Sequence, residues 1–547
     1  LVADDAARPE PNHGGIATGK SHTLNSETIA EIIPSKIDVE KIYMLEYPEV
    51  SDASAYGVIK PDATDALINS LNSGTAILSY IGHGSSYQLA QEKLLDLNRG
   101  DVNQINIDRT LPLWIVGTCS FGWFDDPLNE SFAEELIRAK MNAAAMVIST
   151  TRPITVVGNE RYTKDLFENI FYNGNVSNLS IGSILQSIKD GSSESQYFQL
   201  FGDPAMLVPL PKDTVLSLSI TPDTLETLEK GTFYGLQNII SNDGIGYIHL
   251  IDADRSVTRD YEISSETYSL SFLLPGATLF RGKFSISNSN FEGTLRIPQD
   301  ISYSNNPSKL LLYINDDKKD AIGIINSIPL IGGANTQDNQ GPNIIFETSS
   351  GVRLEQGDHL NIDNNLIIRI SDPLGINLTN EPGHEIILTD LNNEETNNLT
   401  NKFYYDTNSI ITGTINYPTN NNELNLKVKA WDNANNPNEK NIILYRTEIN
   451  KLKIYNVYNY PNPFTISTQF TFELTKTADI SIEIYTLGGK KIKSIKRNNS
   501  QIGFNIINWN GLDTFGDNIA NGVYLYRIKA TDENGANSFI GRCAKFK

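Results

Sequence analysis

The feature that most constrains the fold is a change of pattern near Pro209-Leu-Pro211. Before this point, short apolar runs alternate with segments of helical period, which predicts βαβ units around a mostly parallel sheet. After it, helical periods vanish. Short strands with period-two alternation are separated by Asn, Gly and Pro turns, as is typical of β-sandwiches. The sequence therefore predicts an α/β domain followed by all-β domains.

Length and pattern together predict the domain organisation. A chain of 547 residues has room for about three to five domains. We place an α/β domain at 1–211, β-sandwiches at 212–335 and 336–451, and a smaller β-sandwich at 452–547. Within 1–211, strands are expected at 42–45, 76–81, 113–116 and 144–149, and helices at 26–33, 63–71, 131–140, 161–171 and 181–189. Ser131-Phe-Ala-Glu134 predicts a capping box at the start of the third helix.

The charge balance excludes several classes of partner. The chain has 65 Asp and Glu against 44 Lys and Arg, a formal net charge of −21. An acidic surface repels phosphate backbones and acidic membranes, so we expect no nucleic-acid partner.

No run approaches the roughly 20 apolar residues that span a bilayer. The chain opens on Leu1-Val-Ala without an initiator Met, so we expect that an amino-terminal part is missing.

A histidine and a cysteine follow neighbouring predicted strands. His83 stands in Tyr80-Ile-Gly-His83-Gly84 after the strand at 76–81, and Cys119 follows the strand at 113–116. Because ligands bind at the carboxyl ends of parallel strands, both side chains are expected at one crevice. A thiol beside an imidazole forms a nucleophilic thiolate. A buried structural cysteine with a surface histidine fits the spacing equally well.

The other cysteine and histidine positions carry weaker signals. Two cysteines cannot form a disulfide framework, and Cys543 in a strand-like segment is expected to be a half-buried apolar residue. His13 and His22 lie in a polar stretch near the predicted crevice. They lack the helical or Cys/His ligand spacing of a zinc site, so we expect none there.

Four motifs, in this order, resemble the gingipain-type cysteine peptidases, a family with a caspase-like fold. They are Tyr80-Ile-Gly-His83-Gly84, Leu111-Pro-Leu-Trp-Ile-Val-Gly-Thr-Cys119, Phe124-Asp-Asp-Pro with Ser131-Phe-Ala-Glu134, and Leu200-Phe-Gly-Asp203-Pro204. The resemblance implies that Cys119 is the nucleophile and His83 its catalytic partner. It also implies an oxyanion hole formed by the backbone N–H groups of Gly84 and Cys119.

Members of this family place an acidic residue after an earlier strand to orient the histidine. Asp4 and Asp5 are the matching positions, with Asp5 preferred and Asp4 the alternative; a solvated or helix-capping pair is as good an interpretation. The family requires no cofactor, but calcium is known in it, and Asp125 and Asp126 are weak calcium candidates. A solvated acidic turn explains Asp125 and Asp126 better.

The last hundred residues resemble a second family. Tyr460-Pro-Asn-Pro-Phe464, Ile480-Ser-Ile-Glu-Ile-Tyr485 and Trp509-Asn-Gly511 are separated by turn residues, which predicts a small Ig-like sandwich. The array is similar to the C-terminal sorting domains of type IX secretion cargo and to the FlgD-like immunoglobulin fold. Such a domain implies export to the cell surface of a Gram-negative bacterium, in association with the outer membrane.

The order of the domains resembles the sortase branch of the gingipain-type family. This resemblance implies a cell-surface peptidase and transpeptidase that removes sorting domains from cargo and passes the cargo to a lipopolysaccharide amine. Its partners would be the cargo proteins, that acceptor and an outer-membrane β-barrel of the secretion system. Two alternatives remain open: a secreted gingipain-like endopeptidase, and a non-enzymatic surface scaffold or adhesin.

Overall fold

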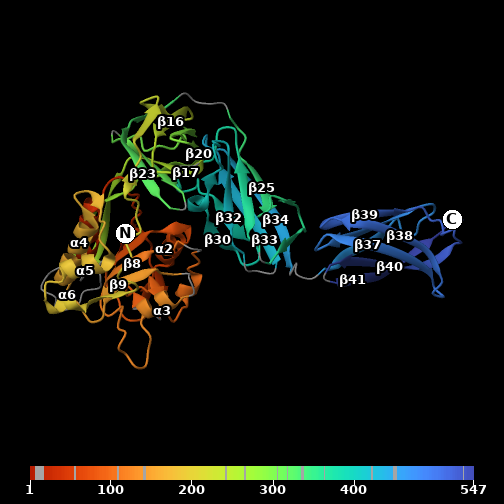
Figure 1. Cartoon of the computed structure of the whole chain (residues 1–547), viewed down its shortest axis with the longest axis horizontal. Helices are drawn as coiled ribbons and strands as arrows, with labels where there is room; N and C mark the ends of the chain where they lie inside the picture. Colours follow the sequence, from red (N-terminus) through yellow and green to blue (C-terminus); the bar gives the residue numbers. More distant parts are fainter. Residues whose placement is uncertain are drawn as a thin grey trace.

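The computed structural model describes all residues except 6–17, 54–56, 108–109, 140–142, 241–242, 264–265, 305, 317, 334–337, 363, 420–422, 448–451, 534 and 547. An α/β region lies at one end of the molecule, a β-rich middle region lies beside it, and an all-β tail stands apart at the carboxyl end (Figure 1). In the described part of the chain, no helix has the length and apolar content needed to cross a membrane.

A mostly parallel sheet organises the α/β region. Its strand order is β12-β9-β8-β5-β1-β2, and only β12 among them runs antiparallel to its neighbour. The strands are β1 Val2–Ala3, β2 Ile42–Tyr43, β5 Ile77–Ile81, β8 Leu113–Gly117, β9 Met146–Thr150 and β12 Phe198–Phe201. The strands expected from the sequence are all present. The one expected at 42–45 ends early, because a 3₁₀ turn, Met44–Glu46, follows it.

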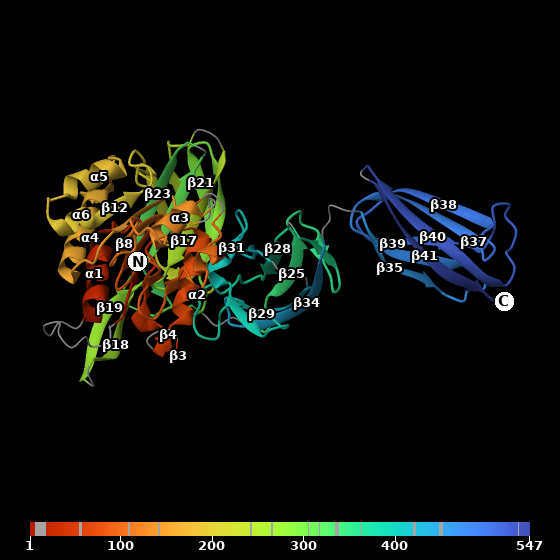
Figure 2. The same cartoon turned by 90° about the horizontal axis from the view of Figure 1, so that it is seen from below.

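Helices cover both faces of this sheet. They are α1 Thr18–Ile32, α2 Pro61–Gly74, α3 Phe132–Arg138, α4 Val156–Ile170, α5 Ile181–Ile188 and α6 Ser193–Tyr197. Apolar side chains of α2 and α3 share one hydrophobic cluster, and those of α1, α4 and α5 share another. Helices α1, α4, α5 and α6 lie together on one side of the region (Figure 2). The capping box of Ser131 and Glu134 at the start of α3 is confirmed.

Short hairpins and turns complete the α/β region. These are β3 Val50–Asp52 with β4 Gly57–Ile59, β6 Gln88–Leu89 with β7 Leu95–Asp96, β10 Phe171–Tyr172 with β11 Asn175–Val176, and the 3₁₀ turn Asp101–Gln104. The β6–β7 hairpin follows β5 directly, and the backbone of Ala90 donates a hydrogen bond to the carbonyl oxygen of His83. This contact fixes the segment that leaves the carboxyl end of β5.

The middle region has strands in two stretches of sequence. The first holds β13 Asp213–Thr214, β14 Ser217–Thr221, β15 Leu225–Glu226, β16 Lys230–Leu236, β17 Gly244–Ile251, β18 Arg255–Ile263, β19 Glu266–Leu274, β20 Thr278–Ser287, β21 Asn290–Arg296, β22 Ser308–Asn315, β23 Asp320–Ile328 and β24 Leu330–Ile331. The second holds β25 Asn343–Thr348, β26 Arg353–Leu354, β27 His359–Asn361, β28 Leu366–Ser371, β29 Ile387–Asp390, β30 Glu395–Asn398, β31 Tyr404–Tyr405, β32 Thr412–Tyr417, β33 Glu423–Trp431 and β34 Pro437–Thr447, with a 3₁₀ turn at Thr400–Lys402.

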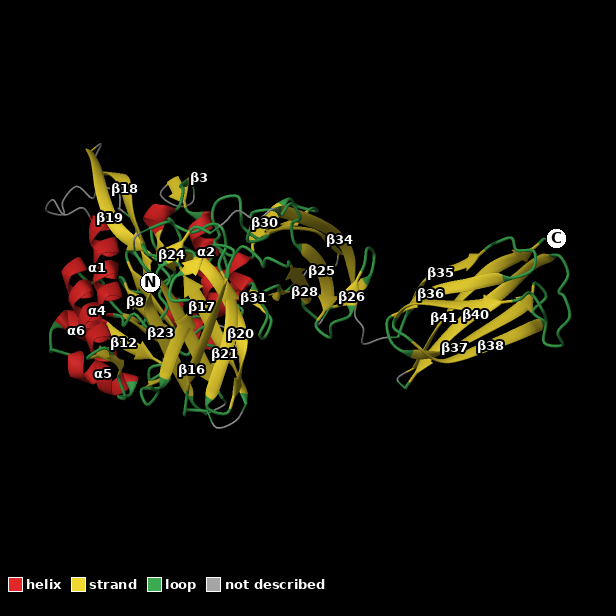
Figure 3. Cartoon of the chain, turned by 90° about the horizontal axis from the view of Figure 1, so that it is seen from above, coloured by secondary structure: helices red, strands yellow, loops and turns green. Residues whose placement is uncertain are grey.

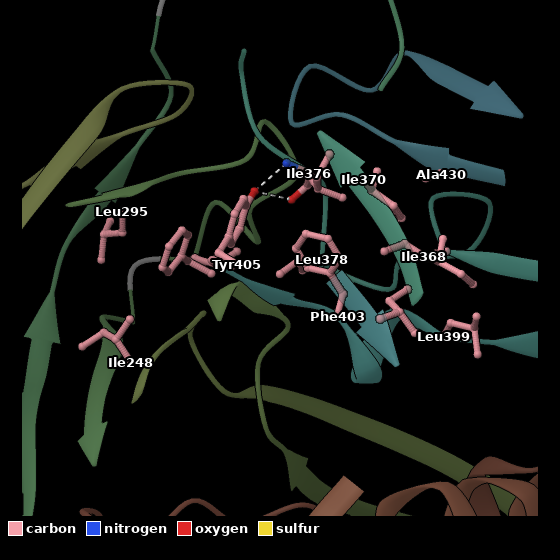
Figure 4. Packing of buried hydrophobic residues seen from close by; sticks show 14 of the residues in the cluster. Ile248, Leu295, Ile368, Ile370, Ile376, Leu378, Leu399, Phe403, Tyr405 and Ala430 are labelled. Atoms are coloured by element: carbon pink, nitrogen blue, oxygen red, sulfur yellow. Dashed lines mark hydrogen bonds between the residues drawn. The ribbon is translucent and has the colours of Figure 1, made fainter. Parts of the chain in front are cut away.

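One hydrophobic cluster joins these two stretches. It runs from Ile220 to Leu444, and β20 pairs with β31 through Gly282 and Tyr405. The Tyr405 hydroxyl lies inside the cluster, where it accepts from the N–H of Ile376 at 2.5 Å and donates to the Ile376 carbonyl at 3.1 Å (Figure 4). Burial of this phenol therefore leaves no polar atom without a partner.

A hairpin of the middle region reaches back to the α/β region. Strands β18 and β19 pair with each other and lie beside α1 (Figure 3). Phe272 packs edge-to-face on Tyr43, with ring centroids 5.4 Å apart, and both belong to a small cluster with Ala3 of β1. The α/β and middle regions are therefore packed together at β1 and β2, the last two strands at one edge of the sheet.

The tail is a pair of antiparallel sheets. Strands β35 Ile454–Tyr460, β36 Thr468–Leu474 and β39 Gly503–Trp509 form one, and β38 Lys491–Ser500, β37 Ala478–Thr486, β40 Gly522–Asp532 and β41 Gly535–Lys545 form the other. The predicted boundary at 211/212 falls between β12 and β13. Those at 335/336 and 451/452 lie outside the described residues.

Candidate active site

Asp4 and His83 meet at the carboxyl ends of β1 and β5. Oδ2 of Asp4 accepts hydrogen bonds from the backbone N–H of His83 at 2.8 Å and from Nδ1 of its ring at 2.9 Å. Asp4 is only 2% exposed. Burial by itself raises the pKa of this carboxyl. The hydrogen bonds and the charge of His83 lower the pKa by a larger amount, so that it lies below its usual value. Asp4 is therefore an ionised group that can orient and stabilise a charged imidazole.

The two glycines that flank His83 allow close packing within the protein. A Cβ on Gly82 would lie 2.4 Å from Cβ of Asp4, and one on Gly84 would lie 2.6 Å from Oγ1 of Thr118. In the structure, the space beside them is taken by Asp4 and by the residue that precedes Cys119.

Asp5 has a different partner from Asp4. Its carboxylate forms a buried ion pair with Lys60 at 2.6 Å, and Lys60 also donates to the carbonyl oxygen of Met44. Burial, followed by the charge of Asp4, raises the pKa of Asp5 to about 6, although Lys60 opposes this shift. Asp4, the alternative in the sequence interpretation, contacts His83, and Asp5, the preferred residue, does not. Successive side chains of an extended segment point to opposite sides, which separates the two carboxylates.

A third buried carboxylate stands behind this pair. Oxygen atoms of Asp4, Asp5 and Glu92 lie within 4.8 Å of one another. Burial, then the charges of Asp5 and Asp4, raise the pKa of Glu92 to about 8. A protonated Glu92 avoids a third negative charge in this cluster at neutral pH. Nothing in the sequence around Glu92 indicated this place.

Cys119 leaves β8 at the position that matches His83 on β5. The two strands are parallel, and Ile81 of β5 lies opposite Gly117 of β8. His83 and Cys119 each come two residues after this pair. Sγ of Cys119 lies 3.6 Å from the carbonyl oxygen of Ile154, to which the thiol donates. The side chain is partly exposed. The structure thus brings the two predicted residues to neighbouring strand ends.

Thr150 holds the turn that carries Cys119. Its hydroxyl donates to the carbonyl oxygen of Thr118 and accepts from the N–H of Ser120 at 3.1 Å. Ser120 has a positive φ of 56°, a conformation that costs free energy for a residue with a side chain. The bonds of Thr150 offset this cost. Sequence reasoning missed Thr150, although it ends a sheet strand next to β8, a position that could have marked it.

Two backbone N–H groups near the candidate site make no hydrogen bond within the described part of the chain. Among the residues that the structure describes, the N–H groups of Gly84 and Cys119 donate to no backbone or side-chain oxygen. Gly84 faces Leu89 in a β-bridge whose hydrogen bonds are made by its neighbours His83 and Ser85. Unpaired N–H groups beside a thiol can stabilise a developing oxyanion.

A second histidine contacts His83. His22 on α1 packs edge-to-face against the His83 ring, with centroids 5.0 Å apart and an interplanar angle of 89°. Burial lowers the pKa of His22 to about 4, so its imidazole is neutral at pH 7. His13, which the sequence placed beside it, lies outside the described residues. The helix that carries His22 was expected only from residue 26.

Asp125 and Asp126 do not fit a calcium ion in this structure. Arg152 engages both oxygens of Asp125, at 2.9 and 2.5 Å. The carboxylate of Asp126 accepts from the N–H of Leu128 and from the side chain of Asn129. Calcium needs six to eight oxygen ligands. The guanidinium group of Arg152 already binds both oxygens that Asp125 could offer to the ion.

The remaining features lie away from the candidate site. Cys543 is buried in the core of the tail and is not disulfide-bonded; burial raises the pKa of its thiol to about 12. A cavity of about 690 Å³ opens at the amino ends of the sheet strands, between Leu1, Ile77 and residues of the middle region such as His249. Neither His83 nor Cys119 lines this cavity.

Comparison with known proteins places two segments of the chain. Residues 1–209 match the model of peptidase family C25, and residues 456–541 match that of a secretion system C-terminal sorting domain. No curated protein matches the chain.

Several solved structures are similar to parts of the chain. The dimeric latent PorU from Porphyromonas gingivalis is 21% identical, over 73% of this chain and 41% of its own, with a TM-score of 0.27. The Arg-specific cysteine proteinase gingipain R (RgpB) is 15% identical, over 60% of this chain and 66% of its own, with a TM-score of 0.30. The complex of Porphyromonas gingivalis RgpB pro- and mature domains is 14% identical, with coverages of 60% and 67% and a TM-score of 0.29.

This chain spans less than half of the PorU chain that it matches. A sorting domain at the carboxyl end marks secreted and cell-surface proteins. Residues 1–209 are therefore similar to peptidase family C25, a family of cysteine peptidases, and residues 456–541 are similar to a secretion system C-terminal sorting domain.

Proposed function

We propose that this chain is a cell-surface cysteine peptidase and transpeptidase that removes C-terminal sorting domains from type IX secretion cargo. In this proposal, Cys119 is the nucleophile, His83 the proton carrier and Asp4 the residue that orients His83. The observation that supports these roles most directly is the Asp4–His83 hydrogen bond, formed at the strand ends beside Cys119.

The first half-reaction forms an acyl-enzyme. The thiol of Cys119 gives up its bond to Ile154 and passes its proton to His83, and the thiolate attacks a peptide carbonyl of the cargo. The N–H groups of Gly84 and Cys119 donate to the oxyanion of the tetrahedral intermediate. The imidazolium of His83 then protonates the leaving amine, and the sorting domain departs.

The buried carboxylate of Asp4 supports each proton transfer. Because it accepts from Nδ1 of His83, it keeps the opposite ring nitrogen, Nε2, directed to the reacting groups. It also stabilises the imidazolium that forms when the thiol is deprotonated, as in other catalytic triads. Asp5 does not take this role, since its charge is engaged by Lys60.

The second half-reaction decides between hydrolysis and transfer. Water attacking the thioester releases a free carboxylate, whereas an amine attacking the same carbonyl forms a new amide bond. We propose that the acceptor is an amine on surface lipopolysaccharide and that an outer-membrane β-barrel holds the enzyme at the cell surface. The sorting domain at 456–541 supports surface localisation without selecting the acceptor.

We also propose that residues 1–211 form a caspase-like domain. The following segments, 212–335 and 336–451, would be two Ig-like sandwiches, and 452–547 an Ig-like sorting domain. Among the described residues no α-helix follows β12, which supports the first boundary. The shared cluster of the middle region indicates that the two central sandwiches are packed as one body.

The decisive experiment is intact-mass analysis of a cargo protein that carries a sorting domain, incubated with this chain and a small primary amine. We expect loss of the sorting domain and addition of the amine at the new carboxyl terminus. Cys119→Ala should abolish both, and Cys543→Ala is the matched control because that thiol lies in the tail core.

Other products would select another function. Addition of water alone, or cleavage at scattered sites, would identify an endopeptidase. An intact cargo together with an unmodified Cys119 after treatment with a thiol-directed inhibitor would support a scaffold or adhesin. Turnover by Cys119→Ala equal to that of the parent protein would overturn the catalytic assignment.

A further inference from the structure

His22 is a buried imidazole without a hydrogen-bond partner. It is 3% exposed, and in the described part of the chain neither Nδ1 nor Nε2 has a donor or acceptor within reach. A buried polar group that loses its hydrogen bonds costs about 1–3 kcal/mol. Such groups are rare in folded proteins, and one explanation is an unseen ion.

Two other groups of ligand type lie close to the ring of His22. One ligand atom each from Asp4, His22 and His83 lies within 4.8 Å of the others. Asp4 and His83 are already joined at 2.9 Å. In a tetrahedral complex with bonds of about 2.0–2.1 Å, ligand atoms lie about 3.4 Å apart. Movements of about 1–2 Å therefore suffice to bring the three side chains onto one ion.

The ligand chemistry selects the class of metal. Two imidazole nitrogens and one carboxylate oxygen are a common donor set for zinc, with the fourth position left to water. Calcium and magnesium prefer oxygen ligands alone. His83 is 31% exposed on its side chain, which gives an ion from solvent a path to the site.

We propose that Asp4, His22 and His83 form a binding site for a zinc-class divalent cation, and that its occupation switches the peptidase off. The ion replaces the Nδ1 proton that His83 shares with Asp4, and this proton moves to Nε2, so that the imidazole stays neutral. With Nδ1 on the metal and Nε2 protonated, the imidazole cannot accept the proton of Cys119. The inhibition rests on the proposed function, whereas the binding of the ion does not.

This site escaped the sequence analysis for a physical reason. Its three ligands come from the end of β1, from α1 and from the end of β5, and no local spacing links them. The packing of α1 against β1 and β5 is what brings His22 to the strand ends. The expectation that His22 takes part in no zinc site thus followed from the absence of a local motif.

Binding is tested on the full chain in a Cys119→Ala background, which removes the thiol as a ligand. Isothermal titration with zinc chloride should show one site. Adding His22→Phe should weaken zinc binding at least about 100-fold. The reason is that loss of a direct ligand should exceed the roughly 10- to 100-fold effect of changing a residue that only contacts a ligand. Phenylalanine retains a ring against His83. His359→Phe, at a half-buried histidine of the middle region, is the matched control and should leave the affinity unchanged. Equal zinc affinity in the His22→Phe and parent proteins would overturn the site.

X-ray absorption of the zinc-loaded Cys119→Ala protein provides a second measurement that needs no folded His22 variant. The spectrum should show nitrogen and oxygen neighbours with two imidazole rings and no sulfur. A spectrum with one imidazole or none would overturn the proposal.

The inhibitory half is tested by activity. Zinc should inhibit the parent protein reversibly, and a chelator should restore its metal-free rate. His22→Phe should need at least about tenfold more zinc for half-inhibition, each variant being compared with its own metal-free rate. Tight binding without inhibition would overturn the switch alone, while cargo cleavage by Cys119→Ala would overturn the proposed function and leave the metal site standing.

Discussion

The carboxylate of Asp4 accepts two hydrogen bonds from one residue, His83, through the backbone N–H at 2.8 Å and through ring Nδ1 at 2.9 Å. A single oxygen, Oδ2, receives both. This arrangement fixes the position of the His83 backbone and the orientation of its ring together. Because Asp4 directly follows β1, and β1 pairs with β5, the sheet itself positions the histidine.

Asp4→Asn should lower kcat by about 100-fold or more, because an amide at this position loses the charge and can favour the wrong imidazole tautomer. Asp5→Asn should lower kcat less than about tenfold and reduce stability instead, since it leaves Lys60 buried without its counter-ion. Single-turnover acylation and thermal unfolding of the two variants separate these effects. The reverse ranking in kcat would return the orienting role to Asp5.

Thr150→Val should slow acylation by at least about tenfold and lower the free energy of unfolding by about 1–3 kcal/mol, because the carbonyl of Thr118 loses its buried donor. Thr150→Ser, which keeps the hydroxyl, should recover most of the rate. The matched control is Ser149→Ala, which removes a buried hydroxyl that donates to Val116 within the sheet. This control should lose stability and keep its rate. Equal rates for Thr150→Val and Ser149→Ala would mean that the turn does not depend on Thr150.

Gly84→Ala should reduce kcat by about tenfold or more, approaching the 100- to 1000-fold loss typical of a missing oxyanion donor. The new Cβ would lie 2.6 Å from Oγ1 of Thr118 and 3.0 Å from its Cγ2, so the segment must shift. Thr118→Ala in the same chain removes both atoms and should restore part of the rate. Gly488→Ala, whose nearest atom lies at 3.9 Å, should have no effect on the rate. Full activity of Gly84→Ala would rule out a role for the Gly84 N–H.

Asp372→Asn should raise the stability of the middle region at pH 8. Burial first, then the charges of Asp432 and Asp338, raise the pKa of Asp372 to about 6. A folded pKa above the unfolded value penalises the native state above pH 6, and the penalty fades as the pH falls from about 6 towards 4. The amide removes the charge and keeps an acceptor for Leu374. Thermal unfolding in a chelator should show a gain of about 1–3 kcal/mol at pH 8.

The pH dependence is the control for this last prediction. Near pH 4 the gain from Asp372→Asn should have disappeared, because Asp372 is then protonated in the folded protein and the parent carries no penalty. Asp223→Asn, at an exposed aspartate of the same region, should change stability little at either pH. A gain from Asp372→Asn that is independent of pH would contradict the electrostatic explanation.

Local sequence determined much of the α/β region, because local interactions decide where its elements begin. Ser131 and Glu134 satisfy each other's backbone donors within one turn of helix, so the start of α3 can be predicted from four residues. Buried parallel strands are continuous apolar runs, which located β5, β8 and β9. From these, the strand-end rule placed His83 and Cys119 at one edge of the sheet.

The sequence by itself determined the order of βα units, the change to β structure after Pro211 and the places of His83 and Cys119. The tertiary structure decided which carboxylate meets the histidine, since Asp4 and Asp5 differ by one position and only the packing of β1 sends one to His83 and the other to Lys60. It also decided the places of His22, Glu92 and Thr150. The physical reason is the same for all of these residues. A contact between residues far apart in the chain depends on how helices and strands pack, and no local pattern of apolar and polar residues specifies that packing.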